Sequence, residues 1–129
     1  MITATSAKLR EVSSMSVICD SGDLIPNAGV CALIGGDQVA IFYLPDSEQK
    51  VFAISNYDPF GRANVLSRGI VGSLNGRVVV ASPLLKQHFD LSSGRCLEDE
   101  TVAVKTYSVE LVDNQVVAQV VATDRRREF

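Results

Sequence analysis

The sequence predicts an all-β protein, and three observations support this prediction. Short runs rich in Val, Ile, Phe and Tyr recur along the chain at the length of strands. Gly, Asn and Asp residues separate many of these runs, as they do in turns between antiparallel strands. Helical periodicity is almost absent, since only Asp23–Asn27 predicts a single helical turn. These features together are typical of an antiparallel β-sandwich or barrel.

Each strand is predicted from a run of β-branched, aliphatic or aromatic residues between turn residues. The Asn75-Gly76 pair is the strongest local signal, because both residues tolerate the positive φ values of a type I′ hairpin turn. Gly35-Gly36 and Asp113-Asn114 predict two further turns. The predicted strands are, in chain order, Ser16–Cys19, Val30–Ile34, Gln38–Tyr43, Val51–Ser55, Ile70–Leu74, Arg77–Ala81, His88–Leu91, Thr101–Lys105, Tyr107–Leu111 and Gln115–Val121.

The 129 residues predict one domain over 15–121, between a flexible N-terminal tail (1–14) and a charged C-terminal tail (122–129). The net charge of -3 argues against a nucleic-acid partner, which would require a basic face. No apolar run approaches the about 20 residues that cross a bilayer, so no membrane partner is expected. The three cysteines are odd in number and widely spaced, which favours reduced, buried thiols and a cytoplasmic location.

Two stretches are predicted as loops, 56–66 and 81–87, and the second one leads into a motif. The run from Ser82 to Leu97 resembles the second cluster-binding loop of Rieske-type proteins, which reads Cys-Pro-x-His-Gly-x-x-Phe-Asp and ends in a Gly-containing turn. Asp58-Pro59-Phe60 lies where that family has Cys-Pro-His. The order of strands, loops and hairpin also agrees over residues 16–121. The resemblance implies a Rieske-like antiparallel β-sandwich or barrel with a small inserted loop subdomain.

The residues that would hold a Rieske cluster are missing from the matching positions, which are occupied by Asp58, Phe60, Ser82 and Leu85. A Rieske centre needs two thiolates and two imidazoles, and Phe and Leu have no lone pair to donate. The whole chain has one His and three Cys, too few for a Rieske cluster or for a four-thiolate cluster. Lys86 also replaces the glycine that follows the second ligand in the family. We therefore expect no cofactor and no metal in this chain.

A short Rieske-like chain without cluster ligands is similar to the small subunit of bacterial assimilatory NAD(P)H-dependent nitrite reductases. This resemblance implies an accessory subunit without catalytic residues or activity of its own. Its partner would be the large catalytic subunit, which carries FAD, an iron–sulfur cluster and sirohaem and reduces nitrite to ammonium. Two alternatives stay open: an interaction module of another oxidoreductase complex, and an electron-transfer protein with a degenerate cluster site.

Other candidate sites have weaker support. Cys19, Cys31, Cys96 and His88 could ligate zinc, but they lack the close pairing of structural zinc ligands. Ser82, His88 and Asp90 could form a hydrolase triad, but Ser82 is not on a Gly-x-Ser-x-Gly turn. Asp58 with Glu98, Asp99 and Glu100 could form a carboxylate site, although Glu98–Glu100 is more simply a solvated loop.

Simpler roles are predicted for several of these residues. We expect His88 to face water from its strand and Asp90 to accept hydrogen bonds from the amides of the following turn, where Gly94 takes a positive φ. Because the lost ligands pointed inward, we expect Phe60 and Leu85 to pack inward as well. By the same logic we expect Leu84 and Lys86 to face outward. The residues expected to offer contacts to a partner are Tyr57, Pro59, Leu84 and Lys86.

Overall fold

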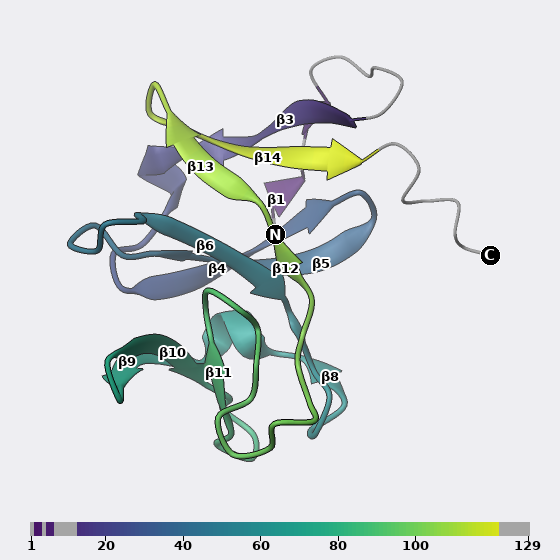
Figure 1. The fold of residues 1–129 in the computed structure, drawn as a ribbon. Coiled ribbons are helices and arrows are strands. Elements are labelled where there is room, and N and C mark those ends of the chain that lie inside the picture. Colours follow the sequence, from purple (N-terminus) through teal and green to yellow (C-terminus); the bar gives the residue numbers. More distant parts are fainter. Residues whose placement is uncertain (1, 4, 7–12, 122–129) are drawn as a thin grey trace.

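The protein consists of antiparallel sheets stacked in layers (Figure 1). The structure is a computed structural model that describes residues 2–3, 5–6 and 13–121. Its sheets have the strand orders β1-β4-β5-β6-β12, β13-β14-β3-β2, β11-β10-β9 and β7-β8. No helix in the described residues is both long enough and apolar enough to span a bilayer. The described elements are strands and two 3-10 turns, so the predicted all-β class is confirmed.

The five-stranded sheet is the central layer, and both of its faces are buried. It comprises β1 (Ile2–Thr3), β4 (Ala28–Ile34), β5 (Asp37–Tyr43), β6 (Val51–Ser55) and β12 (Thr106–Tyr107). Successive side chains of a strand point to opposite faces, so a strand buried on both sides needs an uninterrupted apolar run. The residues from Val39 to Phe42 form such a run, and each is 0% exposed.

One face of the central sheet packs against the four-stranded sheet, which Figure 1 shows above it. That sheet comprises β2 (Thr5–Ser6), β3 (Ser13–Asp20), β13 (Val109–Val112) and β14 (Gln115–Val121). The core between the two sheets includes Ile18 and Val116 from the outer layer and Val39 and Ile41 from the central layer. Burial of these side chains provides the main stabilisation of this half of the protein.

The opposite face of the central sheet packs against a smaller unit formed by residues 56–105. This unit lies between β6 and β12, which pair with each other, so it is an insertion into the main sandwich. It contains the hairpins β7 (Tyr57–Asp58)/β8 (Ala63–Asn64) and β9 (Ile70–Leu74)/β10 (Arg77–Ala81), and the strand β11 (His88–Asp90). Phe42 and Ile54 of the central sheet share a core with Val80 and Phe89 of the insertion. The predicted inserted subdomain is thus confirmed.

The predicted hairpin turns are confirmed by their backbone angles. Asn75 and Gly76 have φ values of 54° and 77°, and Gly35 and Gly36 have 59° and 88°, as a type I′ turn requires. The strands β6, β9, β10 and β14 have the bounds that were predicted from the sequence.

Three predicted elements differ from the structure. The strand expected over 101–105 does not form, because Asp99 accepts hydrogen bonds from the amide and hydroxyl of Thr101 and turns the chain there. The strand expected over 107–111 divides into β12 and β13, which belong to different sheets. The helical turn expected at 23–27 is a 3-10 turn at Ser21–Asp23, with a second one at Leu66–Arg68.

The N-terminal segment contains strands that the sequence did not predict. Ile2–Thr3 pairs in parallel with β4, Thr5–Ser6 pairs with β3, and β3 itself begins at Ser13. Such backbone pairing at a sheet edge requires no apolar pattern, which explains why a Ser/Thr-rich segment was interpreted as a tail. The charged tail predicted over 122–129 lies outside the described residues.

Candidate functional site

The positions that the sequence matched to cluster ligands lie in two loops that contact each other. The first loop, 58–62, turns between β7 and β8, and the second, 82–87, joins β10 to β11. Gly61 of the first loop lies against Leu84 of the second so closely that a Cβ at Gly61 would overlap the Leu84 side chain. The two loops are thus packed together at one end of the inserted unit.

A buried carboxylate–hydroxyl pair joins the two loops. The side chains of Asp58 and Ser82 are 0% and 1% exposed, and the Ser82 hydroxyl donates a hydrogen bond to Oδ2 of Asp58. The other carboxylate oxygen, Oδ1, accepts the amide N–H groups of Phe60 at 2.8 Å and Gly61 at 3.1 Å. Ser82 Oγ in turn accepts the amide N–H of Leu84 at 3.2 Å. Every polar atom of this pair is therefore engaged in holding the two loops.

The two apolar residues at the matched positions behave differently from each other. Phe60 is partly buried and packs against the core of the insertion, with its ring centroid 6.2 Å from that of Phe89. The predicted inward packing is thus confirmed for Phe60. For Leu85 it is wrong, because this side chain is 56% exposed. The side chain that packs against Gly61 of the facing loop is Leu84, and Leu85 stays on the surface.

This difference predicts different stability costs for two truncations. Phe60→Ala is expected to lower the free energy of unfolding by about 1–3 kcal/mol, since a half-buried ring loses part of its packing. Leu85→Ala is the matched control from the facing loop, and its effect is expected to stay within about 0.5 kcal/mol. Urea unfolding of both variants measures the two values, and an equal cost would contradict the placement of these side chains.

The residues at these positions do not fit a Rieske cluster. The Asp58 carboxylate and the Ser82 hydroxyl are bonded to each other, and the Phe60 ring and the Leu85 side chain have no donor atom. Within the described residues no group of three or more His, Cys, Asp or Glu side chains could hold a metal ion. Lys86 has a left-handed backbone conformation, with φ of 68°, at the position where the Rieske-type family has glycine.

We call the tip surface a set of five exposed residues on or next to the two loops: Tyr57, Pro59, Leu84, Leu85 and Lys86. Arg62 and Pro83 are also exposed in these loops. Lys86 faces outward as predicted, whereas Leu84 is 45% exposed and also packs against Gly61, so its outward orientation is confirmed in part; Leu85 adds to the apolar area.

Ile70 was not singled out from the sequence, although it is 77% exposed. It begins β9 and pairs with Ala81, the residue before Ser82, so it lies at the same end of the hairpin as the second loop. The signal that could have found it is its position as the first residue of a predicted edge strand.

Asn56 is a second residue that the sequence analysis did not identify. It is 2% exposed and lies at the start of the insertion. Its amide nitrogen donates to Gln38 Oε1 at 3.2 Å, while its amide oxygen accepts the N–H of Ser67 at 2.7 Å. One side chain thus connects the central sheet to the inserted unit. A lone Asn after a strand carries no sequence signal for this role.

The three cysteines are distributed over different parts of the protein. Cys19 lies in the core between the two large sheets and Cys96 in the core of the insertion, while Cys31 on β4 is partly exposed. Burial raises the pKa of all three thiols; with Asp23 and Asp20 nearby, that of Cys19 reaches about 11. A raised pKa disfavours the thiolate, which is the form that reacts and binds metals.

The residues of the suggested hydrolase triad have separate partners. Ser82 is bonded to Asp58, while His88 Nδ1 lies 2.6 Å from Glu98 Oε2. Asp90 Oδ1 accepts the amides of Ser92 and Ser93, and Gly94 has φ of 79°, so both predictions for this turn are confirmed.

The predicted solvated loop at 98–100 is confirmed in part. Glu98 and Glu100 are exposed, but Glu98 also accepts the His88 amide at 2.8 Å. Partial burial by itself would raise the pKa of Glu98. The hydrogen bonds from the His88 amide and ring have a larger and opposite effect, so the pKa lies below its usual value. The ring of His88 faces water only partly, because it is paired with this carboxylate.

Comparison with known proteins finds similarity over most of the chain. The family model of the Rieske-like [2Fe-2S] domain matches residues 14–119. The nitrite reductase (NADH) small subunit of Salmonella typhimurium is 52% identical over 105 residues, which cover 81% of this chain and 96% of that protein. The Escherichia coli protein NirD, solved by NMR, has a TM-score of 0.75 and 48% identity, covering 83% of this chain and 96% of that one.

A further similarity is to a segment of a much larger protein. The nitrite reductase [NAD(P)H] large subunit of Klebsiella oxytoca is 37% identical over 99 residues. These residues are 77% of this chain but only 10% of the Klebsiella protein.

Proposed function

We propose that this chain is the accessory subunit of an NADH nitrite reductase. The premise is that the chain belongs to the Rieske-like family that includes the NADH nitrite reductase small subunits. The large subunit is its catalytic partner, and together they reduce nitrite with NAD(P)H. Ammonium is the product that we propose, with nitrate or nitrite assimilation in the cytoplasm as the setting. The identity to the Salmonella small subunit over nearly its full length is the observation that carries this proposal.

The choice of partner has support from the Klebsiella relative. In that protein a segment similar to this chain lies within a polypeptide named as the large subunit. Covalent linkage of two domains keeps one at a high effective concentration near the other, which benefits domains that act together. We infer that the separate chain reaches the same arrangement by non-covalent binding.

We further propose that this chain binds no iron–sulfur cluster. The support is the Asp58–Ser82 hydrogen bond, which occupies both oxygen-bearing side chains at the matched positions, and the lack of a donor atom at Phe60 and Leu85. Redox chemistry would then belong to FAD, an iron–sulfur cluster and sirohaem in the large subunit. This chain would contribute by binding and orienting that subunit.

The tip surface is the contact that we propose for the large subunit. Tyr57, Pro59 and Leu84 expose apolar area there, and Lys86 adds one positive charge. Apolar area left exposed at one end of a small protein is a common mark of an interface. The hydrogen bonds that join the two loops hold this surface in one shape before binding, which lowers the entropic cost of association.

The proposal predicts a colourless chain that supports activity only in a complex. The purified protein, after anaerobic incubation with iron and sulfide, is expected to show no visible absorbance and no stoichiometric iron. Added to the large subunit, it is expected to co-elute with it and to increase nitrite-dependent oxidation of NAD(P)H. Stoichiometric iron would instead support the electron-transfer alternative. Full activity of the large subunit alone would overturn the accessory role.

A further inference from the structure

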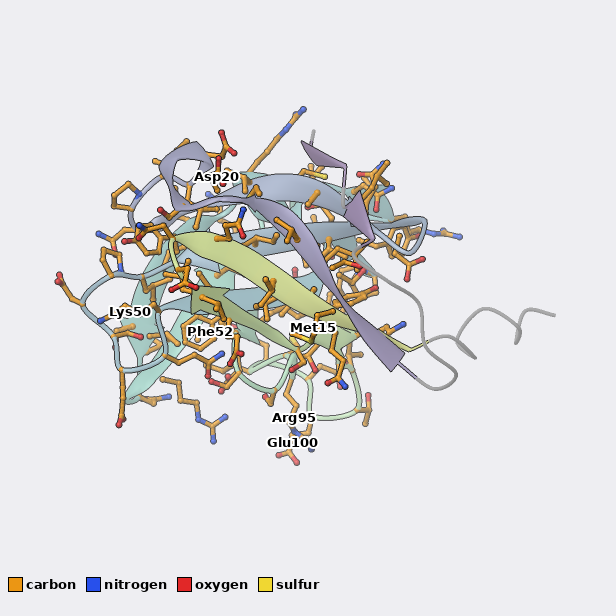
Figure 2. All side chains as sticks on the ribbon, turned by 90° about the horizontal axis from the view of Figure 1, so that it is seen from above. Met15, Asp20, Lys50, Phe52, Arg95 and Glu100 are labelled. Carbon is orange, nitrogen blue, oxygen red and sulfur yellow. The ribbon has the colours of Figure 1, made fainter. Side chains whose placement is uncertain are left out.

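The strand β9 (Ile70–Leu74) forms an uncovered edge of the small sheet β11-β10-β9. The opposite edge, β11, is covered by the segment that follows it: Phe89 forms a bridge with Cys96, and the amide of Asp90 donates to the carbonyl of Arg95 at 2.9 Å. Figure 2 shows Arg95 of this segment at the edge of the protein. In the described part of the chain β9 pairs with β10 alone, and Figure 1 shows it at the outer side of the inserted unit.

The hairpin geometry determines which backbone groups of β9 face outward. In a hairpin with a two-residue turn, the residues that flank the turn exchange hydrogen bonds, so Leu74 and every second residue before it bond with β10. Val71 and Ser73 therefore direct their N–H and C=O groups away from β10. The residue opposite Ser73 agrees with this alternation, since the carbonyl of Val78 accepts the Leu91 amide at 3.0 Å, on the side of β10 away from β9. Within the described residues these outward groups of β9 have no backbone partner.

The edge lacks the features by which proteins prevent strand pairing. Exposed edges are usually protected by a charged side chain, a proline or a bulge. Residues 70–74 contain no charge and no proline, and their register with β10 is regular throughout. Ile70 and Leu74 are 77% and 37% exposed, and among the described residues a Cβ at Gly72 would meet nothing within 4 Å except its chain neighbours. A further strand thus has open access to this edge.

We propose that β9 pairs in antiparallel fashion with β9 of a second copy of this chain. With Gly72 on the two-fold axis, Val71 of each copy lies opposite Ser73 of the other, and each such pair exchanges two backbone hydrogen bonds. Ile70 of each copy then lies opposite Leu74 of the other, so the exposed apolar side chains contact each other. The glycines on the axis have no side chains that could collide. This self-complementarity favours a second copy over an unrelated segment.

The arrangement leaves the tip surface of both copies accessible. Ser82, which begins the second loop, follows β10 at the end where Ile70 pairs with Ala81. Because the two β9 strands run antiparallel, the tip surfaces lie at opposite ends of the joined sheet. A strand pair of this length buries less than the roughly 1,600 Å² of a standard interface, so we expect a weak dimer with a dissociation constant on the order of 100 µM.

Cysteine cross-linking tests the proposed register. Gly72→Cys places a thiol on the two-fold axis, and Gly22→Cys is the matched control, because Gly22 is also exposed, has no positive φ and has open space at its Cβ position. After mild oxidation of the full chain near the expected dissociation constant, non-reducing electrophoresis is expected to show at least about fivefold more dimer for Gly72→Cys than for Gly22→Cys. Equal cross-linking of the two variants would overturn the proposal.

Sedimentation equilibrium measures the association without a cross-link. The wild-type chain is expected to dimerise reversibly, and Ser73→Pro to weaken the dimer by at least about tenfold, because proline removes an outward N–H but no bond to β10. Ser73→Ala keeps that N–H and is expected to associate as the wild type does. A wild type that stays monomeric would overturn the proposal, and if Ser73→Pro then weakened binding to the large subunit, the edge would pair with that subunit instead. Unchanged melting temperatures establish that the variants are folded.

Discussion

Asp58→Ala is expected to lower the free energy of unfolding by about 3–5 kcal/mol, which is a large part of the stability of a domain of this size. The carboxylate is fully buried and accepts three hydrogen bonds, from the Ser82 hydroxyl and from the amides of Phe60 and Gly61. Truncation would leave the buried Ser82 hydroxyl and the part-buried amides of Phe60 and Gly61 without their acceptor, and a fully buried unsatisfied donor costs about 1–3 kcal/mol. Urea unfolding followed by circular dichroism measures the loss.

A double-mutant cycle separates the Asp58–Ser82 bond from the other contacts of each residue. Ser82→Ala alone is expected to cost about 1–3 kcal/mol, and the double variant less than the sum of the two single variants. Asp46→Ala supplies the control, because Asp46 is an exposed acidic residue in a turn. Strict additivity of the Asp58 and Ser82 variants would contradict a direct bond between the two loops.

The sequence predicted the fold well where local chemistry and burial agree. The bounds of β9 and β10 follow from Asn75 and Gly76, whose preference for positive φ is a property of the residues themselves. The uninterrupted apolar run around Val39–Phe42 was assigned to a strand correctly. The burial of this strand on both faces depends on the four-stranded sheet and the inserted unit that pack against it, and these contacts are seen only in the structure.

Residues 101–105 illustrate why some elements could not be predicted. Their composition favours a strand, but the Asp99 side chain turns the backbone before Thr101, and the segment forms only an isolated bridge between Arg95 and Ala103, with scattered backbone hydrogen bonds to Gly94, Cys96 and Ser55. Such a bridge depends on a contact that no local pattern describes.

The candidate site, like the fold, could be predicted where residue chemistry alone decides and could not be predicted where tertiary contacts decide. Counting Cys and His residues sufficed to predict that a Rieske cluster would lack its ligands. What replaces them was beyond the sequence, because Asp58 and Ser82 are 24 positions apart and become partners only when two loops meet. Leu85 was placed wrongly for the same reason: its neighbour Leu84 is the residue that packs against Gly61, a contact that forms only when the two loops meet.

Leu84→Glu combined with Leu85→Glu is expected to weaken binding to the large subunit by about a hundredfold, with the chain still folded. Leu85 is 56% exposed and Leu84 45% exposed, but Leu84 also packs against Gly61, so a moderate fall in melting temperature is expected and is measured beside binding. In the proposed complex the tip surface is buried, and two carboxylates there would have to be desolvated without partners. Interferometry against the large subunit measures the loss.

Ile25→Glu is the matched control for this effect. Ile25 is 56% exposed, as Leu85 is, but it lies between the Ser21–Asp23 turn and β4, outside the inserted unit. Its replacement adds one negative charge and removes one exposed aliphatic side chain, half of the change made in the tip variant, so a general effect of charge on association appears in both variants in that proportion. Because only the tip variant is expected to lose binding, an equal loss for Ile25→Glu would mean that charge alone is responsible. Undiminished binding of the tip variant would require the large subunit to approach another face.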